Sequence, residues 1–448
     1  MSRILTYMSL GLCLGALGMA LVGCERTADE EQASASMAEP QRLRFTDAEV
    51  REIRKMSPLP EVPGDETNAY AENPRAQHLG RFLFFDENLS GNGEVSCASC
   101  HKPEHGFSTA DRFGKGLGET PRHPPSLLNI AYHHWYDWDG KADSLWSQAM
   151  RPLESPAEQA TTRTDIVKYV YGDEELRRAY ESIFGEIPDF SDDERYPPDA
   201  RPVRDNPDDP QHQRWMSMTE TQRQQVNLAL TNLTKAIAAY QMQLVSQDAP
   251  FDDYVARLDE GDPADIDAIS KSARRGLKIF VAKGNCVACH NGANFSDGTF
   301  HNLGLPAARP DEPADKGRMA GVETVKRTPF NAQGPFSDDT DGKRAKWLRF
   351  LARTPEDAGQ FKTPTLRNVE KTPPYMHGGQ FETLEQVVVF YSTLPGTARV
   401  GHREEMLEPL GLSESEIADL VAFLETLTGE PVDEELTKQP ESPLLDGE

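Results

Sequence analysis

CASCH (residues 97–101) and CVACH (residues 286–290) are two copies of the pattern CxxCH in a chain of 448 residues. The two cysteines of each copy have the spacing that forms thioethers with the vinyl groups of one porphyrin. The histidine that follows lies under the ring, where its imidazole can ligate iron. We therefore predict two covalently bound haem c groups. Their protein ligands and attachment points are Cys97, Cys100, His101, Cys286, Cys289 and His290.

The two remaining cysteines lie in an N-terminal segment that is typical of an export signal. Residues 1–24 carry Arg3 ahead of an apolar run that ends in LVGC, which resembles the lipobox of bacterial lipoproteins. This likeness predicts cleavage before Cys24 and acylation of its thiol. An ordinary signal peptide or a short membrane anchor is the alternative. We expect a periplasmic lipoprotein anchored to a membrane, with no cysteine left for a structural disulfide.

The charge balance limits the classes of partner that the protein is expected to bind. A formal net charge of −26 argues against binding to nucleic acid and against adsorption on anionic lipid. It would attract a basic redox partner, although an acidic balance is also common for solubility alone. The hydrophobic fraction of 37% is enough for packed cores.

Most periodic segments predict helices, so we expect a mainly α fold. Thr46 and Glu49 form a capping box for a short helix that Pro58 stops. Other predicted helices follow Asn73, span residues 219–245 and 272–283, follow Thr383 and run from Ser413 to Gly429. Residues 185–213 and 307–342 are rich in Asp and Pro and predict exposed loops.

The two motifs predict one haem domain on either side of a boundary near residues 261–263. A duplication would explain the two motifs, although we see little similarity outside them. The predicted parts are a lipoprotein signal peptide (1–24), a flexible linker (25–60), an N-terminal haem domain (61–262), a C-terminal haem domain (263–435) and a tail (436–448).

The wider sequence resembles the bacterial dihaem cytochrome c peroxidases and their MauG-like relatives. The likeness rests on ordered stretches that include LGRFLFFDENLSGNGEVSCASCH, PPSLLNIAY, WDGKADSLWSQ, FKTPTLRNVEKTPPYMHGG and TLEQVVVFY. It implies two mostly helical cytochrome c-like domains that face each other. The first would hold a peroxidatic haem and the second an electron-transfer haem.

The resemblance also identifies a missing ligand at the first haem. Ordinary dihaem peroxidases carry a second histidine about sixteen residues beyond the CxxCH histidine, and this chain has FGKGLG (residues 113–118) there. We therefore expect the first iron to be open on the face opposite His101. The alternative ligands are His105, His123, His133 and His134, for which a core or surface role is preferred.

At the second haem the family pattern predicts a tyrosine ligand. Typical peroxidases place a methionine fourteen residues after the histidine of the PYxHxG segment, and this position, counted from His377, is Tyr391. MauG-like enzymes have tyrosine there. A phenolate is a hard anionic donor that stabilises oxidised iron relative to a thioether. A buried core tyrosine is the bland alternative, and Met376 and Met406 are the alternative ligands.

Three further residues receive catalytic roles by resemblance. Glu158 would be the acid and base of the first haem pocket, and Gln148 would position peroxide. Trp138 would relay electrons between the haems, although tryptophan in the cluster of residues 135–146 can also be packing. Lys141 stands where the family often has arginine.

Two accessory sites follow from the same likeness. Arg367 would pair with haem propionates because guanidinium matches carboxylate, with an ordinary ion pair as the alternative. The family also binds calcium between its domains, partly through backbone oxygens that correspond to Thr372 and Pro374. The usual side-chain ligand is an asparagine, and His123 replaces it here, which is a poor match for Ca²⁺.

The sequence thus supports three functions. The first is a MauG-like enzyme that uses H₂O₂ to oxidise a protein, either an electron carrier or aromatic side chains of a partner, through a high-valent state shared by two haems. Against it, the surface tryptophan expected two residues before the second CxxCH motif is Gly284. The second is a plain cytochrome c peroxidase with a small cytochrome or cupredoxin as donor. The third is a non-catalytic electron-transfer cytochrome.

Overall fold

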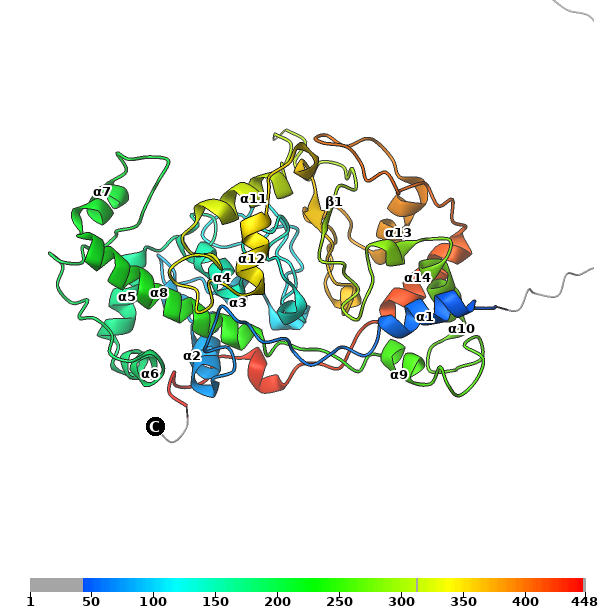
Figure 1. Cartoon of the computed structure of the whole chain (residues 1–448), viewed down its shortest axis with the longest axis horizontal. Helices are drawn as coiled ribbons and strands as arrows, with labels where there is room; N and C mark the ends of the chain where they lie inside the picture. Colours follow the sequence, from blue (N-terminus) through cyan, green and yellow to red (C-terminus); the bar gives the residue numbers. More distant parts are fainter. Residues whose placement is uncertain (1–42, 312, 446–448) are drawn as a thin grey trace, which may run out of the picture. The chain divides into compact units, whose positions relative to one another are not determined.

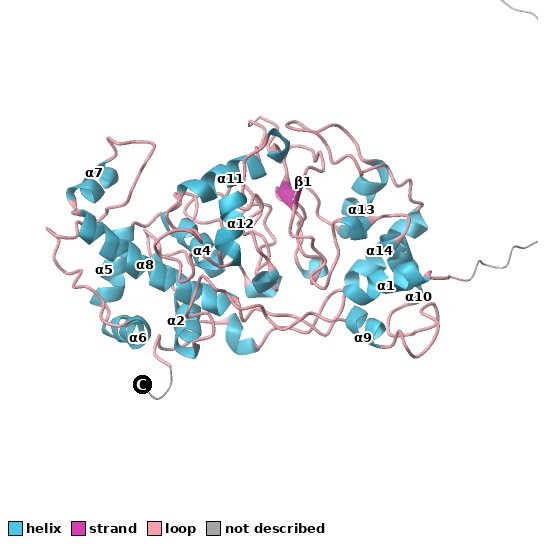
Figure 2. Cartoon of the chain, viewed as in Figure 1, coloured by secondary structure: helices cyan, strands magenta, loops and turns pink. Residues whose placement is uncertain are grey.

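The computed structural model describes residues 43–311 and 313–445. The predicted signal, Cys24 and residues 25–42 of the predicted linker lie outside these residues. Figure 2 shows a chain of helices joined by long loops, as predicted. Within the described part, the regular sheet consists of β1 (Phe300–His301) paired antiparallel with β2 (Phe361–Lys362). No helix among the described residues has both the length and the apolar character needed to cross a bilayer.

The helices follow in chain order and are labelled in Figure 1. Those of the first part of the chain are α1 (Asp47–Lys55), α2 (Pro74–Phe85), α3 (Cys97–Cys100), α4 (Leu145–Glu154), α5 (Arg163–Gly172), α6 (Glu174–Phe184), α7 (Pro210–Ser217) and α8 (Glu220–Gln241). Those of the second part are α9 (Pro250–Ala256), α10 (Lys271–Val281), α11 (Arg318–Arg327), α12 (Lys343–Phe350), α13 (Leu384–Thr393) and α14 (Glu414–Glu425). Short 3-10 turns include η3 (Ile130–Tyr132), η4 (Cys286–Ala288) and η6 (Val369–Lys371).

The predicted helix starts are confirmed by their caps. Thr46 caps α1 with Glu49 in a capping box, and Asn73 caps α2 through its side-chain oxygen. Thr219, Thr383 and Ser413 cap α8, α13 and α14. These short polar side chains accept hydrogen bonds from the first free backbone N–H groups of each helix. This preference makes the helix starts predictable from the sequence.

One loop prediction is wrong. Residues 307–342 contain the helix α11, which the Pro and Gly residues at both ends of the stretch concealed. Its buried residues Arg318, Gly321, Val322 and Val325 recur three, four and seven apart, the spacing of one helix face. Beyond it, Phe330 is also buried in the core.

The buried side chains form two hydrophobic clusters, one around each CxxCH motif. The first collects α2, α4, α5, α8 and the segments between them, and the second collects α9, α10, α13 and α14. Ile53 and Met56 of the predicted linker belong to the second cluster. Phe336 belongs to the first cluster, and Leu436 of the predicted tail packs against it. The chain therefore crosses between its two haem-binding halves more often than the predicted boundaries imply.

Each half is built on the same crossing of two helices. In the first half α2 crosses α8 so closely that a Cβ on Gly80 would overlap the backbone oxygen of Ala236. In the second half α10 crosses α14, and a Cβ on Gly276 would overlap the backbone oxygen of Asp419. Only glycine lets two helix backbones approach this closely.

Aromatic rings continue the repeat in the same register. Four residues after each glycine stand Phe84 and Phe280, and four residues after each contacted oxygen stand Tyr240 and Phe423. The centroids of the rings Phe84 and Tyr240 lie 5.1 Å apart, as do those of Phe280 and Phe423. The agreement of register indicates a duplicated unit, although the amino-acid sequences of the two halves show little similarity outside the CxxCH motifs.

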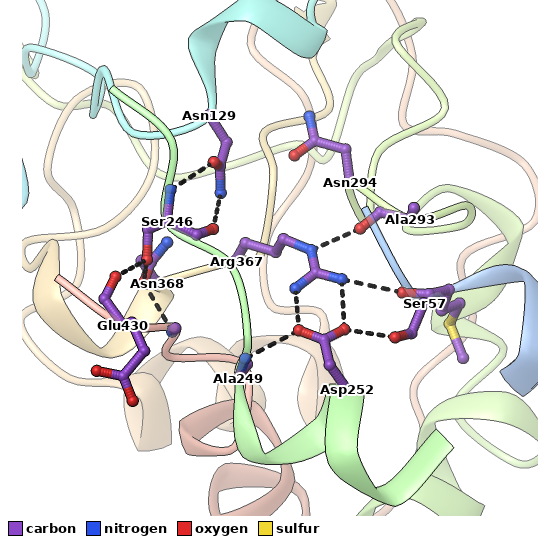
Figure 3. Close-up of polar contacts among 12 residues, drawn as sticks. Ser57, Asn129, Ser246, Ala249, Asp252, Ala293, Asn294, Arg367, Asn368 and Glu430 are labelled. Atoms are coloured by element: carbon purple, nitrogen blue, oxygen red, sulfur yellow. Dashed lines mark hydrogen bonds and ion pairs between the residues drawn. The ribbon is translucent and has the colours of Figure 1, made fainter. Parts of the chain in front are cut away.

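An asparagine in a left-handed conformation joins each unit to the segment that follows its long helix (Figure 3). The backbone N–H of Asn129 donates to Leu244 O at 2.8 Å, and that of Asn368 donates to Leu427 O at 3.0 Å. Ser246 Oγ then donates to Asn368 Oδ1 at 2.9 Å. This bond ties the two repeats to each other at their equivalent positions.

Candidate functional site: two haem-binding centres

The two CxxCH histidines are held identically. His101 Nδ1 lies 3.0 Å from the backbone oxygen of Phe107, and His290 Nδ1 lies 3.0 Å from that of Phe295. Both phenylalanines have positive φ, 54° and 49°, which turns their oxygens toward the rings. Burial lowers the pKa of both histidines, so each is a neutral imidazole. Nδ1–H is thereby used, and Nε2 is the nitrogen left for iron, as at histidine-ligated metal sites.

The cysteines of both motifs are unpaired with one another and lie beside these histidines. Burial raises the pKa of the thiols of Cys97 and Cys286 to about 12. Neither pair forms a disulfide, so all four sulfurs are free for thioether bonds. The donor set of each centre therefore fits one haem c.

A cavity of about 810 Å³ lies beside the second motif. Its walls include His290, Tyr391 and apolar side chains of α13 and α14, and it extends to the first half of the chain. The residues from the first half include Ser108, His123, His133, Asp137 and Trp138. A large, mostly apolar cavity with a few polar groups is the form expected of a cofactor site.

Tyr391 projects into this cavity from α13, as the sequence predicts for a ligand of the second iron. Burial, and then the neighbouring sulfurs of Cys286 and Cys289, raise its pKa well above the usual value. The phenol is therefore protonated unless iron binds it. Of the alternative methionines, Met376 also lines the cavity, whereas Met406 is 51% exposed at its rim.

Glu158 lies at the first centre. Burial, and then the charge of Glu158, raise the pKa of the Cys100 thiol to about 11. Burial also raises the pKa of Glu158 itself, which a hydrogen bond from Ser155 partly offsets. A carboxyl group tuned in this way is suited to acid and base chemistry near neutral pH.

The segment that lacks the family's histidine packs directly on the backbone of Glu158. Leu117 N donates to Glu158 O at 2.8 Å, and a Cβ on Gly116 would overlap that oxygen. Residues 116–118 therefore act as a support for the Glu158 turn. The groups with the largest influence on the pKa of the Glu158 carboxyl, besides burial, are Ser155, Lys141, Asp137 and Arg151.

Gln148 belongs to the same polar cluster. Its Nε2 lies 3.4 Å from Asp137 Oδ1, and Lys141 Nζ lies 3.7 Å from the same oxygen. Asp137 Oδ2 is buried and has no hydrogen-bond partner among the described residues. The structure thus brings together Gln148, Glu158 and Lys141, and adds Asp137, which the sequence did not single out.

The helix α4 of the first half and the helix α13 of the second half are equivalent elements. Ser144 caps α4 and Thr383 caps α13, and both helices contain ten residues. In this register Tyr391 corresponds to Pro152, which has no group that could ligate iron. Pro152 O accepts from Gln159 N at 3.1 Å, so the chain turns back after the proline and presents Glu158.

Trp138, the predicted electron relay, lines the cavity and contacts both halves of the chain. Its Nε1–H donates to His123 O at 2.7 Å, and its backbone oxygen accepts from Lys362 N at 2.8 Å. The centroid of its ring lies 6.5 Å from that of His377, the residue at the equivalent position of the second repeat. The indole is therefore fixed by contacts with both halves.

Arg367 is engaged differently from the prediction. Its Nη1 and Nη2 each lie 2.9 Å from an oxygen of Asp252, and its Nε donates to Ala293 O (Figure 3). Nη2 also donates to Met56 O, and the side chain is 1% exposed. This buried ion pair ties α9 and the N-terminal segment to the second centre. Most of the guanidinium is thereby occupied, which leaves little of it for a haem propionate.

The calcium prediction lacks a suitable donor set. His123 Nε2 lies 3.1 Å from Ser108 Oγ and its Nδ1 lies 3.3 Å from Arg112 O, so both ring nitrogens are occupied. Backbone oxygens of Thr372 and Pro374 alone would fall short of the six to eight oxygens that Ca²⁺ takes. Among the described residues, the metal-ligating groups that cluster are Cys289, Asp297 and His301. The sulfur of Cys289 is needed for attachment of the haem.

The remaining histidines that were alternative ligands of the first iron occupy other positions. His105 lies in the short turn after His101, and the exposed His134 packs edge-on against Trp347. His133 is buried in the cavity wall, where its Nδ1 lies 3.3 Å from Lys362 Nζ.

Lys362 is a second residue that the sequence analysis missed. It is buried in the cavity wall, and burial lowers its pKa to about 8, with Asp137 opposing the shift. A lysine between aromatic and threonine residues of a short strand is a weak sequence signal. Its importance becomes visible only when the fold places it beside Trp138 and His133.

The fold and these two centres define a c-type cytochrome with two haems. The model for the di-haem cytochrome c peroxidase family matches residues 74–260. The chain is 33% identical over 378 residues to cytochrome-c peroxidase IdrP1 of Denitromonas iodatirespirans, covering 83% of this chain and 86% of that protein. It is 32% identical over 372 residues to methylamine utilization protein MauG of Methylorubrum extorquens, covering 83% and 82%.

A solved structure of a MauG-like protein associated with microbial copper homeostasis has the same fold. Its TM-score is 0.58 at 24% sequence identity, over 85% of this chain and 98% of that one. The chain therefore belongs to the family of dihaem cytochrome c peroxidases and MauG proteins. It is a dihaem oxidoreductase, and membership implies two haem c groups, a role for hydrogen peroxide and a redox partner or protein substrate.

Proposed function

We propose that this protein is a MauG-like dihaem peroxidase that uses H₂O₂ to oxidise a protein partner. The observation that carries the proposal is the contrast between the centres. Glu158 lies at the first centre against residues 113–118, which contain no histidine, and Tyr391 lines the cavity of the second centre. The first centre is then suited to peroxide and the second to storage of an oxidising equivalent.

The haem of the first centre would supply the iron on which peroxide is cleaved. Glu158 would take the proton from the oxygen nearer the iron and return it to the departing oxygen, which leaves as water. Ser155 holds this carboxyl group, and the turn after Pro152 holds its backbone. Gln148, turned toward Asp137, would orient the peroxide through its side-chain amide.

Trp138 would carry electrons between the centres. Its indole is hydrogen-bonded to His123 O, which keeps the Nε1 proton in place when the ring is oxidised for a moment. Tyr391 would serve the second centre as an anionic oxygen ligand, which favours the oxidised form of iron relative to methionine sulfur.

A plain cytochrome c peroxidase is the second candidate, because several relatives bear that name. Peroxide-dependent oxidation of a reduced small cytochrome or cupredoxin separates the two. We expect slow turnover with such carriers and a lasting change in the aromatic side chains of the true partner. Rapid turnover with the carrier would contradict modification as the main activity and support the second candidate.

We further propose a periplasmic location with a lipid on Cys24. The support is the sequence of residues 1–24 and the export that haem c attachment requires. Mass spectrometry of the membrane fraction should detect the acylated cysteine, and Cys24→Ala should release the protein from the membrane. Recovery of unmodified wild-type protein in the soluble fraction would contradict the lipid anchor.

A further inference from the structure

The segment from α11 to α12 is basic in an acidic chain. Residues 318–353 carry eight Lys and Arg against four Asp and Glu, whereas the whole chain has a net charge of −26. The helix α12 itself, with the sequence KRAKWLRF, has four cations and no acid. Lys326 Nζ donates to Leu351 O at 2.6 Å, so the end of α11 and the end of α12 lie together (Figure 1).

The outer side of α12 combines these cations with exposed aromatic rings. Phe350 is 82% exposed and Trp347 is 36% exposed, which is unusual for side chains of this size. Lys343 Nζ lies 4.6 Å from the centroid of the Trp347 ring. Lys346 is exposed and has no ion-pair partner among the residues that the structure describes. We call Lys343, Lys346, Trp347, Arg349 and Phe350 the α12 surface.

A chain of contacts leads from this surface to the cavity. The centroids of the Trp347 and His134 rings lie 4.9 Å apart. His134 is followed by the segment that ends in Trp138, and it is preceded by His133, which lines the cavity. Arg344, the one cation of α12 that points inward, donates to His134 O and Asp143 O and so fixes α12 to this segment.

We propose that the α12 surface is the docking site of an acidic protein partner, and that Trp347 passes electrons from the partner to the haem cavity through His134 and residues 133–138. The proposal rests on the proposed function and names its partner class and its route. It also supplies an alternative exit to the surface tryptophan that Gly284 replaces. Cations around exposed aromatic rings are typical of protein interfaces, and positive charge steers a negative partner toward them.

The electron balance is simple. Each H₂O₂ takes up two electrons and two protons and gives two molecules of water. The partner supplies the electrons one at a time: Trp347 loses one electron inward and regains one from the docked partner. A partner whose side chains are modified therefore loses two electrons and two protons for each peroxide, whereas reduced cytochrome c, used as a probe, supplies one electron per molecule. The indole ends unchanged.

The test uses the full-length holoprotein with two reduced cytochromes c of opposite net charge, and guaiacol as a small neutral donor. For Lys346→Glu combined with Arg349→Glu we expect the KM for the acidic cytochrome to rise roughly tenfold at low salt, because four units of charge change at the docking site. This difference should shrink above about 0.3 M salt. For Trp347→Phe we expect kcat with the acidic cytochrome to fall roughly tenfold while KM stays the same.

The matched control is Arg51→Glu combined with Lys55→Glu on the exposed side of α1, which should leave both constants unchanged. Rates are compared as the ratio of cytochrome to guaiacol oxidation, so that general damage to the enzyme cancels. Wild-type constants in both α12 variants, or a wild-type preference for the basic cytochrome, would overturn the docking proposal. If the wild type oxidises neither cytochrome nor guaiacol with peroxide, the proposed function itself fails.

Discussion

The two haem-binding halves share a frame and differ in what faces their irons. Gly80 and Gly276 allow the same helix crossing, and Asn129 and Asn368 make the same backbone contacts. The difference lies two residues before the end of two equivalent ten-residue helices, where the first half has Pro152 and the second has Tyr391. At this register position only the second half offers a side chain that can ligate iron, and the proposed function depends on that difference.

The comparison also explains why the first centre needs a longer chain after its helix. In the first half α4 ends at Glu154, two residues after Pro152, and the chain then folds back through Ser155 to Glu158. Gly116 and Gly118, in the segment after CASCH, then let this turn pack closely against that segment. In the second half, α13 carries Tyr391 on its own face, so no such turn is required.

Removing the acid of the first centre should have the largest effect. We expect Glu158→Gln to lower kcat/KM for peroxide by roughly 10³, because the amide keeps the volume and cannot exchange the proton. The control Glu104→Gln changes an exposed carboxylate close to the same CxxCH motif and should leave kcat/KM for peroxide unchanged. Stopped-flow mixing with peroxide measures both. A Glu158→Gln protein with wild-type rates would show that the halves do not differ in this way.

The helix crossings test whether the halves share a frame. We expect Gly80→Ala and Gly276→Ala each to lower the free energy of unfolding by about 3 kcal/mol, because the new methyl group forces the helices apart. Gly172→Ala at the end of α5 is the control, since nothing lies within 4 Å of its added Cβ. Urea unfolding of the holoproteins measures the change. A large loss at one crossing and none at the other would break the structural equivalence.

The second centre should respond at Tyr391. We expect Tyr391→Met to raise the midpoint potential of one haem by roughly 100 mV or more, because thioether sulfur favours reduced iron. Tyr375→Phe, which alters another tyrosine of the cavity wall, should leave the potential unchanged. Spectroelectrochemistry gives both values. Equal shifts in the two variants would indicate a general effect of the cavity and would argue against ligation.

The pH dependence of the same centre has a definite sign. Burial raises the pKa of Tyr391, so protons compete with iron for the phenolate oxygen. Ligation should therefore weaken as the pH falls and strengthen as it rises. An acid titration of the ferric protein should change the spectrum of one haem, and Tyr391→Phe should abolish that change. A wild-type spectrum that is constant down to the pH of unfolding would contradict ligation by Tyr391.

Removal of metal ions from the contact between the two halves should have the smallest effect. Because the ring nitrogens of His123 are occupied and the donor set does not fit calcium, we expect EDTA to change peroxide turnover less than twofold. Activity is measured before and after chelation and again after calcium is added back. A large loss that calcium reverses would show that backbone oxygens near Thr372 bind the ion after all.

The sequence predicted the parts that depend on local patterns. Capping side chains such as Thr46 and Asn73 gave the helix starts, and the CxxCH spacing gave both attachment sites. It did not predict α11, whose flanking Pro and Gly residues look like a loop. It also could not foresee that Arg367 would pair with Asp252, since that contact joins residues 115 positions apart. The duplication was hidden because a shared backbone frame needs few identical side chains.

The residues of the candidate site also divide into those that a local pattern predicts and those that depend on contacts between distant segments. Family register led to the predictions for Glu158, Gln148, Trp138 and Tyr391, because each keeps a fixed distance in sequence from a motif. Asp137 and Lys362 were missed because their importance arises from burial next to residues of other segments. No local pattern reports which charged groups the fold removes from water.

The unequal faces of the two irons can be measured directly by recording the electron paramagnetic resonance and optical spectra of the ferric holoprotein with and without one equivalent of H₂O₂. The first haem should be high-spin and five-coordinate and should react at once with peroxide. The second should be six-coordinate, with a spectrum that Tyr391→Phe alters. Two low-spin haems with nitrogen or sulfur in every axial position, unchanged by peroxide, would contradict this account.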